Sequence, residues 1–418
     1  MMHDRCSQRI VALLCATATA GYICRVNVST AGALMMKEFG LGQPAMGRIF
    51  SAFLLGYALC QIPGGAAADR WGARRTLRLA AWLWAAVTIL HACIGWGPFV
   101  TMGISASGAL LAARFVLGVF EAPTYPASAQ GVARWVAPSH QGRANGVVIA
   151  SVGLGSALAS PLVSSVMIRW GWRTAMVISA LPSLLVAFIW LRVGEPPSHP
   201  RAVSQPTGIS RAAAGCGALW NRSFAFLTLS YTLQGYVGYI FVSWFYLYLV
   251  QERGFGMLAG AWVNSMSWIL SIVSIPLGGV ISDRLAASAL GKAWGRRTVP
   301  LAGMAASGIL ISVGAHTKSP ATAAAALALA TAFVLSVEGP FWATMMRIAG
   351  PASGTAGGIM NMGCNLGGLI SPVLTPLLAS WLGWENALHV AAGLAIIAAA
   401  LWLGISMGSD RRQAHSQN

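Results

Sequence analysis

Four charged side chains lie within stretches of the sequence that are otherwise apolar: Arg25, Arg114, Glu121 and Glu338. An ionisable side chain at the centre of a lipid bilayer costs about 2.5–3.5 kcal/mol on insertion scales, so it rarely persists without a function or a partner. Arg114 and Glu121 are seven residues apart, which is two helical turns, so both project from one face of one helix. Two arginines and two carboxylic acids in an apolar interior indicate an anion site that is coupled to protonation.

Each of these charges also has a purely structural interpretation. An arginine offers a planar set of donors that suits a carboxylate. Because Arg25 stands alone in the middle of its apolar stretch, we favour an anion contact for it. For Arg114, an ion pair with Glu121 explains the residue at least as well. Glu121 is the candidate for a group that gains and loses a proton near neutral pH. Glu338 is either a second proton site or an acid that stays neutral because it is buried.

The stretches that carry these charges have the length and composition of membrane-spanning helices. The chain is 56% hydrophobic and 9% charged, whereas soluble domains contain about 25% charged residues. Its apolar runs repeatedly reach about 20 residues, enough to cross a hydrocarbon core about 30 Å thick. The runs are continuous rather than alternating, which argues against a transmembrane β-barrel. The sequence therefore predicts an all-α polytopic membrane protein.

We expect twelve transmembrane helices, divided into two groups of six by a segment rich in proline, serine and arginine. The predicted domains are an N-terminal six-helix bundle at 1–193, a cytoplasmic central loop at 194–221, and a C-terminal six-helix bundle with a short cytoplasmic tail at 222–418. The helices are expected at residues 9–36, 45–69, 76–97, 102–133, 142–168, 173–193, 222–251, 258–283, 297–316, 320–347, 354–381 and 385–408.

Basic residues gather in alternate loops, which indicates the orientation of the chain. Loops rich in lysine and arginine stay in the cytoplasm, so the pattern predicts that both termini are cytoplasmic and that the number of spans is even. The net charge of +17 is therefore explained by topology, and no nucleic-acid partner is expected. The basic clusters are Arg70 to Arg78, Arg134 with Arg143, Arg201 to Arg222, Arg284 to Arg297, and Arg411 with Arg412.

The two halves of the sequence repeat one another. Matching residues recur at a nearly constant offset of 211 to 214 residues: Pro161 and Pro372, Trp172 and Trp384, Gly142 and Gly354, Gly146 and Gly358, and Asp69 and Asp283. A near-constant offset over several helices is hard to produce by chance. Parallel repeats of this kind predict two bundles related by an axis along the membrane normal, with a binding site between them.

One motif leaves the second expected helix and enters a basic loop. It comprises Gly65, Asp69, Arg70, Gly72, Arg74 and Arg75, and its acidic and basic pair recurs as Asp283 and Arg284. The spacing resembles the loop signature between the second and third helices of the major facilitator superfamily. The resemblance covers the whole chain, with twelve spans, halves of six and a central loop. It implies a secondary transporter that works by alternating access.

Within that superfamily, the chain is most similar to the anion:cation symporter family, which includes sialin and bacterial sugar-acid, tartrate and phthalate permeases. In that family an arginine of the first helix contacts the substrate carboxylate, and a glutamate of the fourth helix is a protonation site. The resemblance assigns these roles to Arg25 and Glu121. The segments that carry it are 25–29, 56–65, 114–123, 339–342 and 361–368.

Further candidates for substrate contacts are polar and aromatic side chains within the expected spans: Tyr57, Gln61, Tyr236, Tyr239, Trp342 and Asn361. Tyr57 and Gln61 are four residues apart, so they share a helix face. Packing, an aromatic belt at the membrane interface, or hydrogen bonding between helices would also explain residues of these types. For Tyr57 and Asn361 the family resemblance favours a substrate contact.

One position departs from the family pattern. Several bacterial members carry an acid immediately before the arginine of the first helix, where this chain has Cys24. The number of protons per substrate is therefore open. Glu338 could compensate, because it lies two residues before a proline in the tenth helix, as Glu121 does in the fourth.

These observations predict proton-coupled uptake of a small organic anion, such as a sugar acid, a dicarboxylate or an aromatic carboxylate. Sodium coupling, efflux and a non-transporting anion sensor are the alternatives. The sequence has no recognisable nucleophile–base arrangement and no set of histidines or cysteines with metal-ligand spacing, so we expect no enzyme, no cofactor and no metal. We expect a monomer in the inner membrane of a bacterium.

Overall fold

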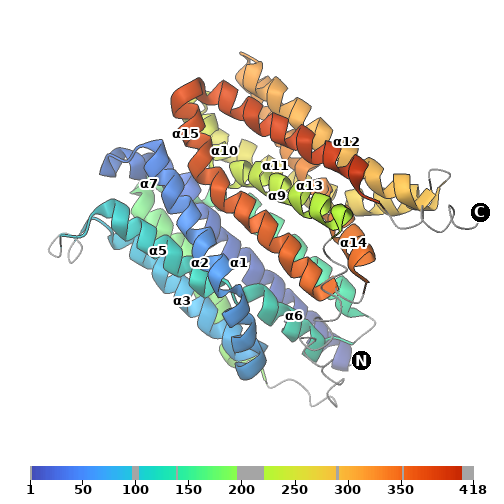
Figure 1. Cartoon of the computed structure of the whole chain (residues 1–418). Helices are drawn as coiled ribbons and strands as arrows, with labels where there is room; N and C mark the ends of the chain where they lie inside the picture. Colours follow the sequence, from blue (N-terminus) through green and yellow to red (C-terminus); the bar gives the residue numbers. More distant parts are fainter. Residues whose placement is uncertain are drawn as a thin grey trace, which may run out of the picture. The chain divides into compact units, whose positions relative to one another are not determined.

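The computed structural model describes residues 2–96, 103–137, 140–194, 221–288, 291–350 and 353–406, and its elements are almost all α-helices (Figure 1). Long apolar stretches fold in this way because a helix satisfies every backbone polar group within the segment, which lipid cannot do. The helices are α1 (Met2–Phe39), α2 (Gln43–Trp71), α3 (Ala73–Cys93), α5 (Ala106–Glu121), α6 (Thr124–Trp135), α7 (Gln141–Arg192), α9 (Arg222–Ser243), α10 (Phe245–Gln251), α11 (Met257–Ala287), α12 (Gly291–His316), α13 (Pro320–Ser336), α14 (Glu338–Ala349) and α15 (Ser353–Leu401).

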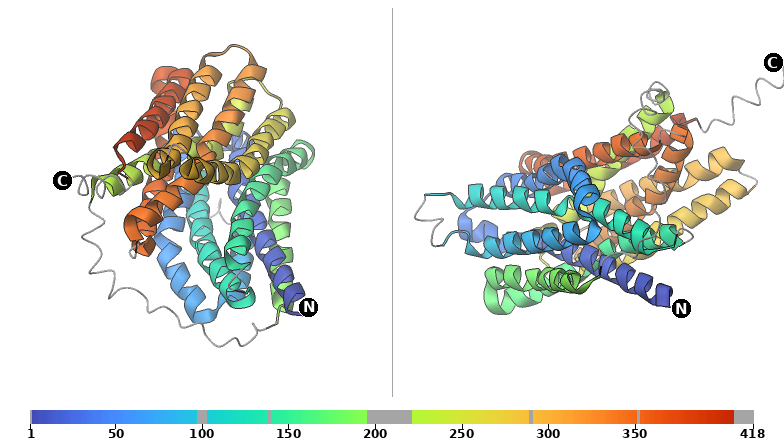
Figure 2. Two further views of the ribbon diagram at one scale, coloured as in Figure 1. Left: turned by 90° about the vertical axis from the view of Figure 1, so that its right-hand side faces the viewer. Right: turned by 90° about the horizontal axis from the view of Figure 1, so that it is seen from below.

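By their internal contacts the helices form two units. The N-terminal unit comprises Met1–Ala202 and Val242–Ile269, and the C-terminal unit comprises Val203–Phe241 and Leu270–Asn418. Within the first unit, α1 and α3 both pack along α7, and α2 packs against α5 (Figures 1 and 2). Within the second, α12 packs against α13 and α15. The predicted domain boundaries at 193 and 222 stay a prediction, and most of the central loop, 195–220, lies outside the described residues.

Two of the long helices are each two helices joined at a glycine. Gly171 within α7 has φ 79°, and Gly383 within α15 has φ 84°. Positive φ is favourable only for glycine, because it has no Cβ. The two glycines immediately precede Trp172 and Trp384, the repeated tryptophans of the sequence. The sequence repeat therefore marks a real turn in each unit.

The described residues contain nine helices that are long and apolar enough to cross a membrane, and ten if the bent pair α9 and α10 is one span. If α7 and α15 are each counted as two spans, this total is consistent with the twelve predicted. Large apolar side chains on these helices are exposed, as lipid-facing residues are, among them Ile62 at 85% and Trp381 at 73%. The predicted multi-pass helical architecture agrees with this structure.

Two of the expected spans are interrupted beside an acidic residue. The fourth expected helix is divided into α5, which ends at Glu121, and α6, which begins at Thr124. The tenth expected helix is divided into α13, which ends at Ser336, and α14, which begins at Glu338. Pro123 and Pro340 follow the two glutamates, and proline has no N–H to continue the hydrogen-bond ladder.

Candidate functional site

Arg25 and Glu121 form a buried ion pair in the N-terminal unit. Arg25 comes from the middle of α1 and Glu121 is the last residue of α5. The Arg25 guanidinium nitrogen Nη1 lies 3.8 Å from the Glu121 oxygen Oε1, and the two side chains are 5% and 2% exposed. A charge at such a site is costly unless it is paired, so each side chain stabilises the other.

Aromatic rings surround the Arg25 guanidinium. Its central carbon lies 4.9, 4.6 and 5.1 Å from the ring centres of Tyr22, Phe53 and Tyr57. Its Nη1 also donates to the hydroxyl of Tyr22 at 3.3 Å. The faces of aromatic rings attract cations, most strongly where water is excluded. These contacts hold the guanidinium in place without adding a second negative charge.

Arg114 contacts the backbone of Arg25 and the ring of Phe53 and does not form the ion pair itself. Its Nη1 donates to the backbone carbonyl of Arg25 at 3.2 Å, and its guanidinium lies 4.8 Å from the ring centre of Phe53. From the sequence, an ion pair between Arg114 and Glu121 is one interpretation of Arg114. In the structure Glu121 pairs with Arg25, while Arg114 is close enough to Glu121 to interact with it electrostatically.

Several polar atoms around this pair are buried without a hydrogen-bond partner among the described residues. They are Arg114 Nε, Glu121 Oε2, Tyr125 Oη, Trp84 Nε1 and His91 Nε2. Buried polar groups are normally hydrogen-bonded, so an unsatisfied group next to a charged pair indicates that something else can bind there. The vicinity of Arg25 and Glu121 thus has unused capacity for a polar ligand or water.

The sequence interpretation missed Tyr22, Phe53 and Tyr125 at this site. The signal for two of them was present in the spacing. Tyr22 precedes Arg25 by three residues on α1, a spacing that places both on one helix face, and Tyr125 follows Glu121 by four, which predicts a shared face if the expected helix were continuous. Phe53 gave no such signal, because α2 brings it to the arginines only through helix packing.

The side chain of Cys24 contacts α7. Its sulfur contacts the carbonyl of Ser179 at 3.4 Å and the hydroxyl of Ser183 at 3.3 Å, both on the second half of α7. On α2, Tyr57 stacks against Phe53, with ring centres 5.9 Å apart, and interacts with the side chain of Gln61. Tyr57 is buried, whereas Gln61 is only partly buried.

Glu338 has a different environment in the C-terminal unit. Its Oε2 accepts a hydrogen bond from the Tyr231 hydroxyl at 2.8 Å, and its Oε1 accepts one from the Gln234 amide at 3.1 Å. Trp342 Nε1 donates to the same tyrosine hydroxyl at 3.2 Å. No lysine or arginine of the described chain forms an ion pair with Glu338. The two acids therefore differ, one facing a cation and the other facing neutral donors.

The remaining predicted contacts lie on α9, α14 and α15. The Tyr236 hydroxyl is 3.0 Å from the Thr375 hydroxyl, and the Tyr239 ring packs over Gly368, where a Cβ would come within 2.6 Å of it. Trp342 is 37% exposed and Asn361 is partly buried. Of these residues, Trp342 joins the Glu338 cluster directly.

Each unit contains one copy of the acidic residue of the loop motif. Asp69 accepts a hydrogen bond from Gln130 at 3.1 Å, and Asp283 pairs with Arg296 at 3.1 Å. Gly72 has φ 79° and joins α2 to α3, so this position needs glycine. The other motif residues are placed around this turn: Arg74 bonds the carbonyls of Trp190 and Leu191, Gly65 lies beside Pro126, and Arg70, Arg75 and Arg284 are exposed.

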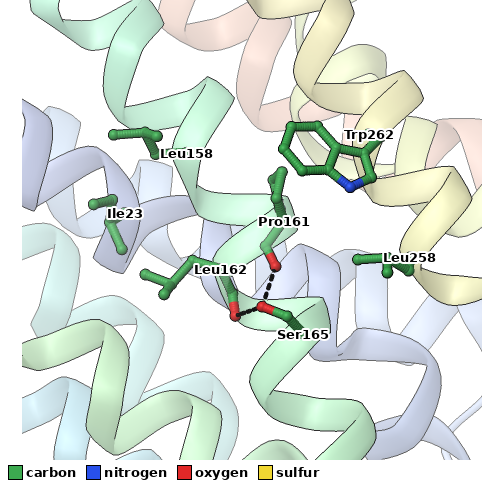
Figure 3. Close-up of a pocket in the computed structure, with 7 residues that line it drawn as sticks. All are labelled: Ile23, Leu158, Pro161, Leu162, Ser165, Leu258 and Trp262. Atoms are coloured by element: carbon green, nitrogen blue, oxygen red, sulfur yellow. Dashed lines mark hydrogen bonds between the residues drawn. The ribbon is translucent and has the colours of Figure 1, made fainter.

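A separate cavity of about 530 Å³ lies in the N-terminal unit among α1, α7 and α11 (Figure 3). Its walls are apolar, and the hydroxyl of Ser165 is already bonded to the carbonyls of Pro161 and Leu162. The lining contains no charged side chain and none of the predicted site residues. This cavity therefore does not have the chemistry of an anion site. It is lined by Ile23, Leu158, Pro161, Leu162, Ser165, Leu258 and Trp262.

Comparison with known proteins identifies the family. The model of the Major Facilitator Superfamily matches residues 13–372. The chain belongs to the major facilitator superfamily. A probable sulfoacetate transporter of Cupriavidus necator is 30% identical over 87% of this chain and 85% of its own length. A probable galactarate/D-glucarate transporter of Bacillus subtilis is 28% identical over 96% of this chain and 92% of its own length.

Solved transporter structures share the fold of this chain. A bacterial homologue of the human lysosomal transporter Spinster, in an inward-facing and unoccupied conformation, matches with a TM-score of 0.80 at 18% identity, covering 96% of each chain. A D-xylose–proton symporter matches with a TM-score of 0.72 at 15% identity, covering 94% of this chain and 96% of its own. The predicted superfamily, fold class and membrane character are confirmed. So is the prediction of a transporter rather than an enzyme. The roles of individual residues stay predictions.

Proposed function

We propose that this protein is a secondary active transporter that carries a small organic anion into the cell together with protons, by alternating access. The observation that carries the proposal is the buried ion pair of Arg25 and Glu121, with Oε2 of the acid left unsatisfied. Arg25 is the proposed binding group for the substrate carboxylate. Glu121 is the proposed proton site.

Coupling between the anion and the proton follows from the net charge of this pair. When Arg25 is charged and Glu121 is ionised, the pair is neutral. An anion bound alone would share the guanidinium of Arg25 with the ionised carboxylate of Glu121, and the two negative charges would repel one another. A proton on Glu121 removes this repulsion, so the anion and the proton favour each other's binding. Protonation also frees the guanidinium of Arg25 for the substrate.

The proposed substrate class is a sugar acid, a dicarboxylate or an aromatic carboxylate. The named substrates of the relatives, sulfoacetate, galactarate and D-glucarate, are all small organic anions. Tyr57 and Gln61 can supply a hydroxyl and an amide to such a molecule. Further contacts are proposed for Tyr236, Tyr239, Trp342 and Asn361.

Glu338 is proposed as a second proton-coupling group. It lies at a helix break, as Glu121 does, and among the described residues its hydrogen-bond donors are neutral. Glu338→Gln should lower the number of protons carried per substrate, measured from the membrane potential at which net flux reverses. An unchanged ratio would rule out this role.

Uptake into proteoliposomes tests the proposed function. The purified protein should accumulate labelled galactarate or sulfoacetate when the external pH is lower than the internal pH, and a protonophore should abolish the accumulation. A sodium gradient at equal pH is the matched control. Accumulation that is indifferent to the proton gradient, or that needs only sodium, would overturn proton coupling. Transport driven only outward would instead favour the efflux alternative.

We further infer that the protein lies in the inner membrane of a bacterium, functions as a monomer and has both termini in the cytoplasm. The basic loops support this orientation, because loops rich in lysine and arginine are retained on the cytoplasmic side. The relatives cited above come from bacteria.

A further inference from the structure

Two histidines and a glutamate that are not part of the Glu338 cluster meet at one end of the C-terminal unit. His316 is the last residue of α12, while Glu385 and His389 follow the turn at Gly383 in α15. The Nδ1 atom of His316 is 2.9 Å from Oε1 of Glu385, and Nε2 of His389 is 3.8 Å from the same oxygen. All three potential ligand atoms lie within 4.8 Å of one another.

The ring of His389 is oriented by a fourth residue. Its Nδ1 is 3.2 Å from the hydroxyl of Ser312, which lies one turn before His316 on α12. This contact occupies one ring nitrogen and leaves Nε2 facing the carboxylate. Histidines that bind metals in proteins are usually held in this way, with the second ring nitrogen hydrogen-bonded to a neighbouring group.

The equivalent place in the N-terminal unit is built differently. The repeat offset of 212 residues that relates Trp172 to Trp384 also relates Arg173 to Glu385. Arg173 forms an ion pair with Glu38 at 2.7 Å and donates to the carbonyl of Ile94 at 3.1 Å, at the end of α3. In the N-terminal unit this position is therefore an arginine that forms an ion pair. In the C-terminal unit the equivalent position belongs to a group of three residues of the types that bind transition metals.

We propose that His316, Glu385 and His389 bind a divalent transition-metal ion of the Zn²⁺ type, with water completing the coordination. Zn²⁺ accepts imidazole nitrogen and carboxylate oxygen at about 2.0–2.2 Å, and two histidines with one glutamate are a known ligand set for it. The three side chains are at least partly exposed, so small rotations can close the present spacing around an ion. A bound cation would replace the direct contacts to Glu385 and join α12 to α15.

The position of this site within the unit is also defined. α12 begins next to the basic loop, where Arg296 pairs with Asp283, and ends at His316. The site therefore lies at the opposite end of α12 from that loop. With the orientation predicted from the basic loops, metal would reach it from outside the cytoplasm.

Metal titration of the purified full-length protein, carrying a tag without histidine, tests the proposal. The wild type should bind one Zn²⁺ ion by calorimetry at this site, and Co²⁺ should give visible absorption bands on binding. His316→Ala, His389→Ala and Glu385→Gln should each weaken binding at least tenfold. Ser312→Ala should weaken it less, because Ser312 only orients a ligand. His140→Ala, an exposed histidine of the other unit, is the matched control and should leave the affinity unchanged.

A second measurement separates loss of metal binding from loss of folding. In EDTA the wild type and the histidine variants should melt at the same temperature, and Zn²⁺ should raise the melting temperature of the wild type but not of the variant lacking both histidines. Equal Zn²⁺ affinity in the wild type and in this double variant would overturn the proposal. So would the absence of Zn²⁺ binding by the wild type, which would leave an ordinary ion-pair cluster.

Discussion

At the scale of the residue, the central feature is that Glu121 and a substrate carboxylate would compete for one guanidinium. Arg25 has aromatic rings on several sides, and its Nη1 lies 3.8 Å from the carboxylate of Glu121. That separation is longer than a charge-assisted hydrogen bond, which is typically about 2.7–2.9 Å. At this distance the attraction between the two charges is the main interaction, and the proposed exchange of partners requires that it can be broken.

Replacing Glu121 by glutamine should separate exchange from accumulation. Glutamine has the size of a protonated glutamate but cannot release a proton, so the variant should behave as if permanently loaded with a proton. We expect Glu121→Gln to lose gradient-driven accumulation in proteoliposomes while it retains counterflow exchange of labelled substrate. Glu252→Gln, at an exposed glutamate, should retain both activities. Normal accumulation by Glu121→Gln would remove this residue from the coupling mechanism.

Replacing Arg25 by lysine should weaken substrate binding while the positive charge is kept. Lysine is a point charge and lacks the planar fork that matches a carboxylate. We expect affinity for the anion to fall at least tenfold, about 1.4 kcal/mol, in calorimetric titration with galactarate or sulfoacetate. Arg143→Lys, at an exposed arginine, is the control. Retained affinity in Arg25→Lys would mean that the carboxylate binds elsewhere.

At the scale of the element, glycines decide how closely the helices around the site approach. A Cβ at Gly56 on α2 would collide with the carbonyl oxygen of Phe115, and one at Gly118 on α5 would collide with that of Phe53. The two helices can cross at this distance only because both positions lack a side chain. This crossing is what brings Phe53 and Tyr57 to the arginines.

Adding a single methyl group at this crossing should therefore disturb both stability and binding. We expect Gly118→Ala to destabilise the protein by about 1–3 kcal/mol, because the neighbour is rigid backbone and cannot rotate away. Thermal unfolding of the purified protein measures this. Gly146→Ala is the matched control, since a Cβ there meets nothing within 4 Å. Equal melting temperatures for the two variants would show that the crossing tolerates more separation than the structure indicates.

At the scale of the whole molecule, the orientation in the membrane is the property that the charge pattern predicts. Two exposed cysteines report on it, because Cys6 lies near the start of α1 and Cys93 is the last residue of α3. α3 begins at the basic loop after Gly72, so its far end should be extracytoplasmic.

A maleimide that cannot cross membranes, added to intact cells, should label Cys93 and spare Cys6. Both should react once the membrane is permeabilised. Cys93→Ser should lose the labelling seen in intact cells, whereas Cys6→Ser should keep it. Labelling of Cys6 in intact cells would reverse the predicted orientation, and with it the predicted side of the metal site.

What the sequence determined by itself is everything that depends on length, composition and local spacing. Apolar runs of membrane-spanning length, the repeat and the basic loops predicted the fold class, and isolated charges in those runs singled out Arg25, Arg114, Glu121 and Glu338. The spacing of three residues between Tyr22 and Arg25 was also a signal in the sequence, although the prediction did not use it. Local spacing is informative because a helix fixes the relative directions of side chains that are three or four residues apart.

Only the tertiary structure decided which residues meet across helices. It paired Glu121 with Arg25 rather than Arg114, gave Glu338 neutral donors, and joined His316 to Glu385 across 69 positions of the chain. The physical reason is that these partners depend on how far each helix is rotated and how closely it approaches its neighbour. Glycines and helix breaks determine both the rotation and the approach of a helix. They change which residues of a neighbouring helix come into contact, and the spacing within one helix does not reveal those contacts.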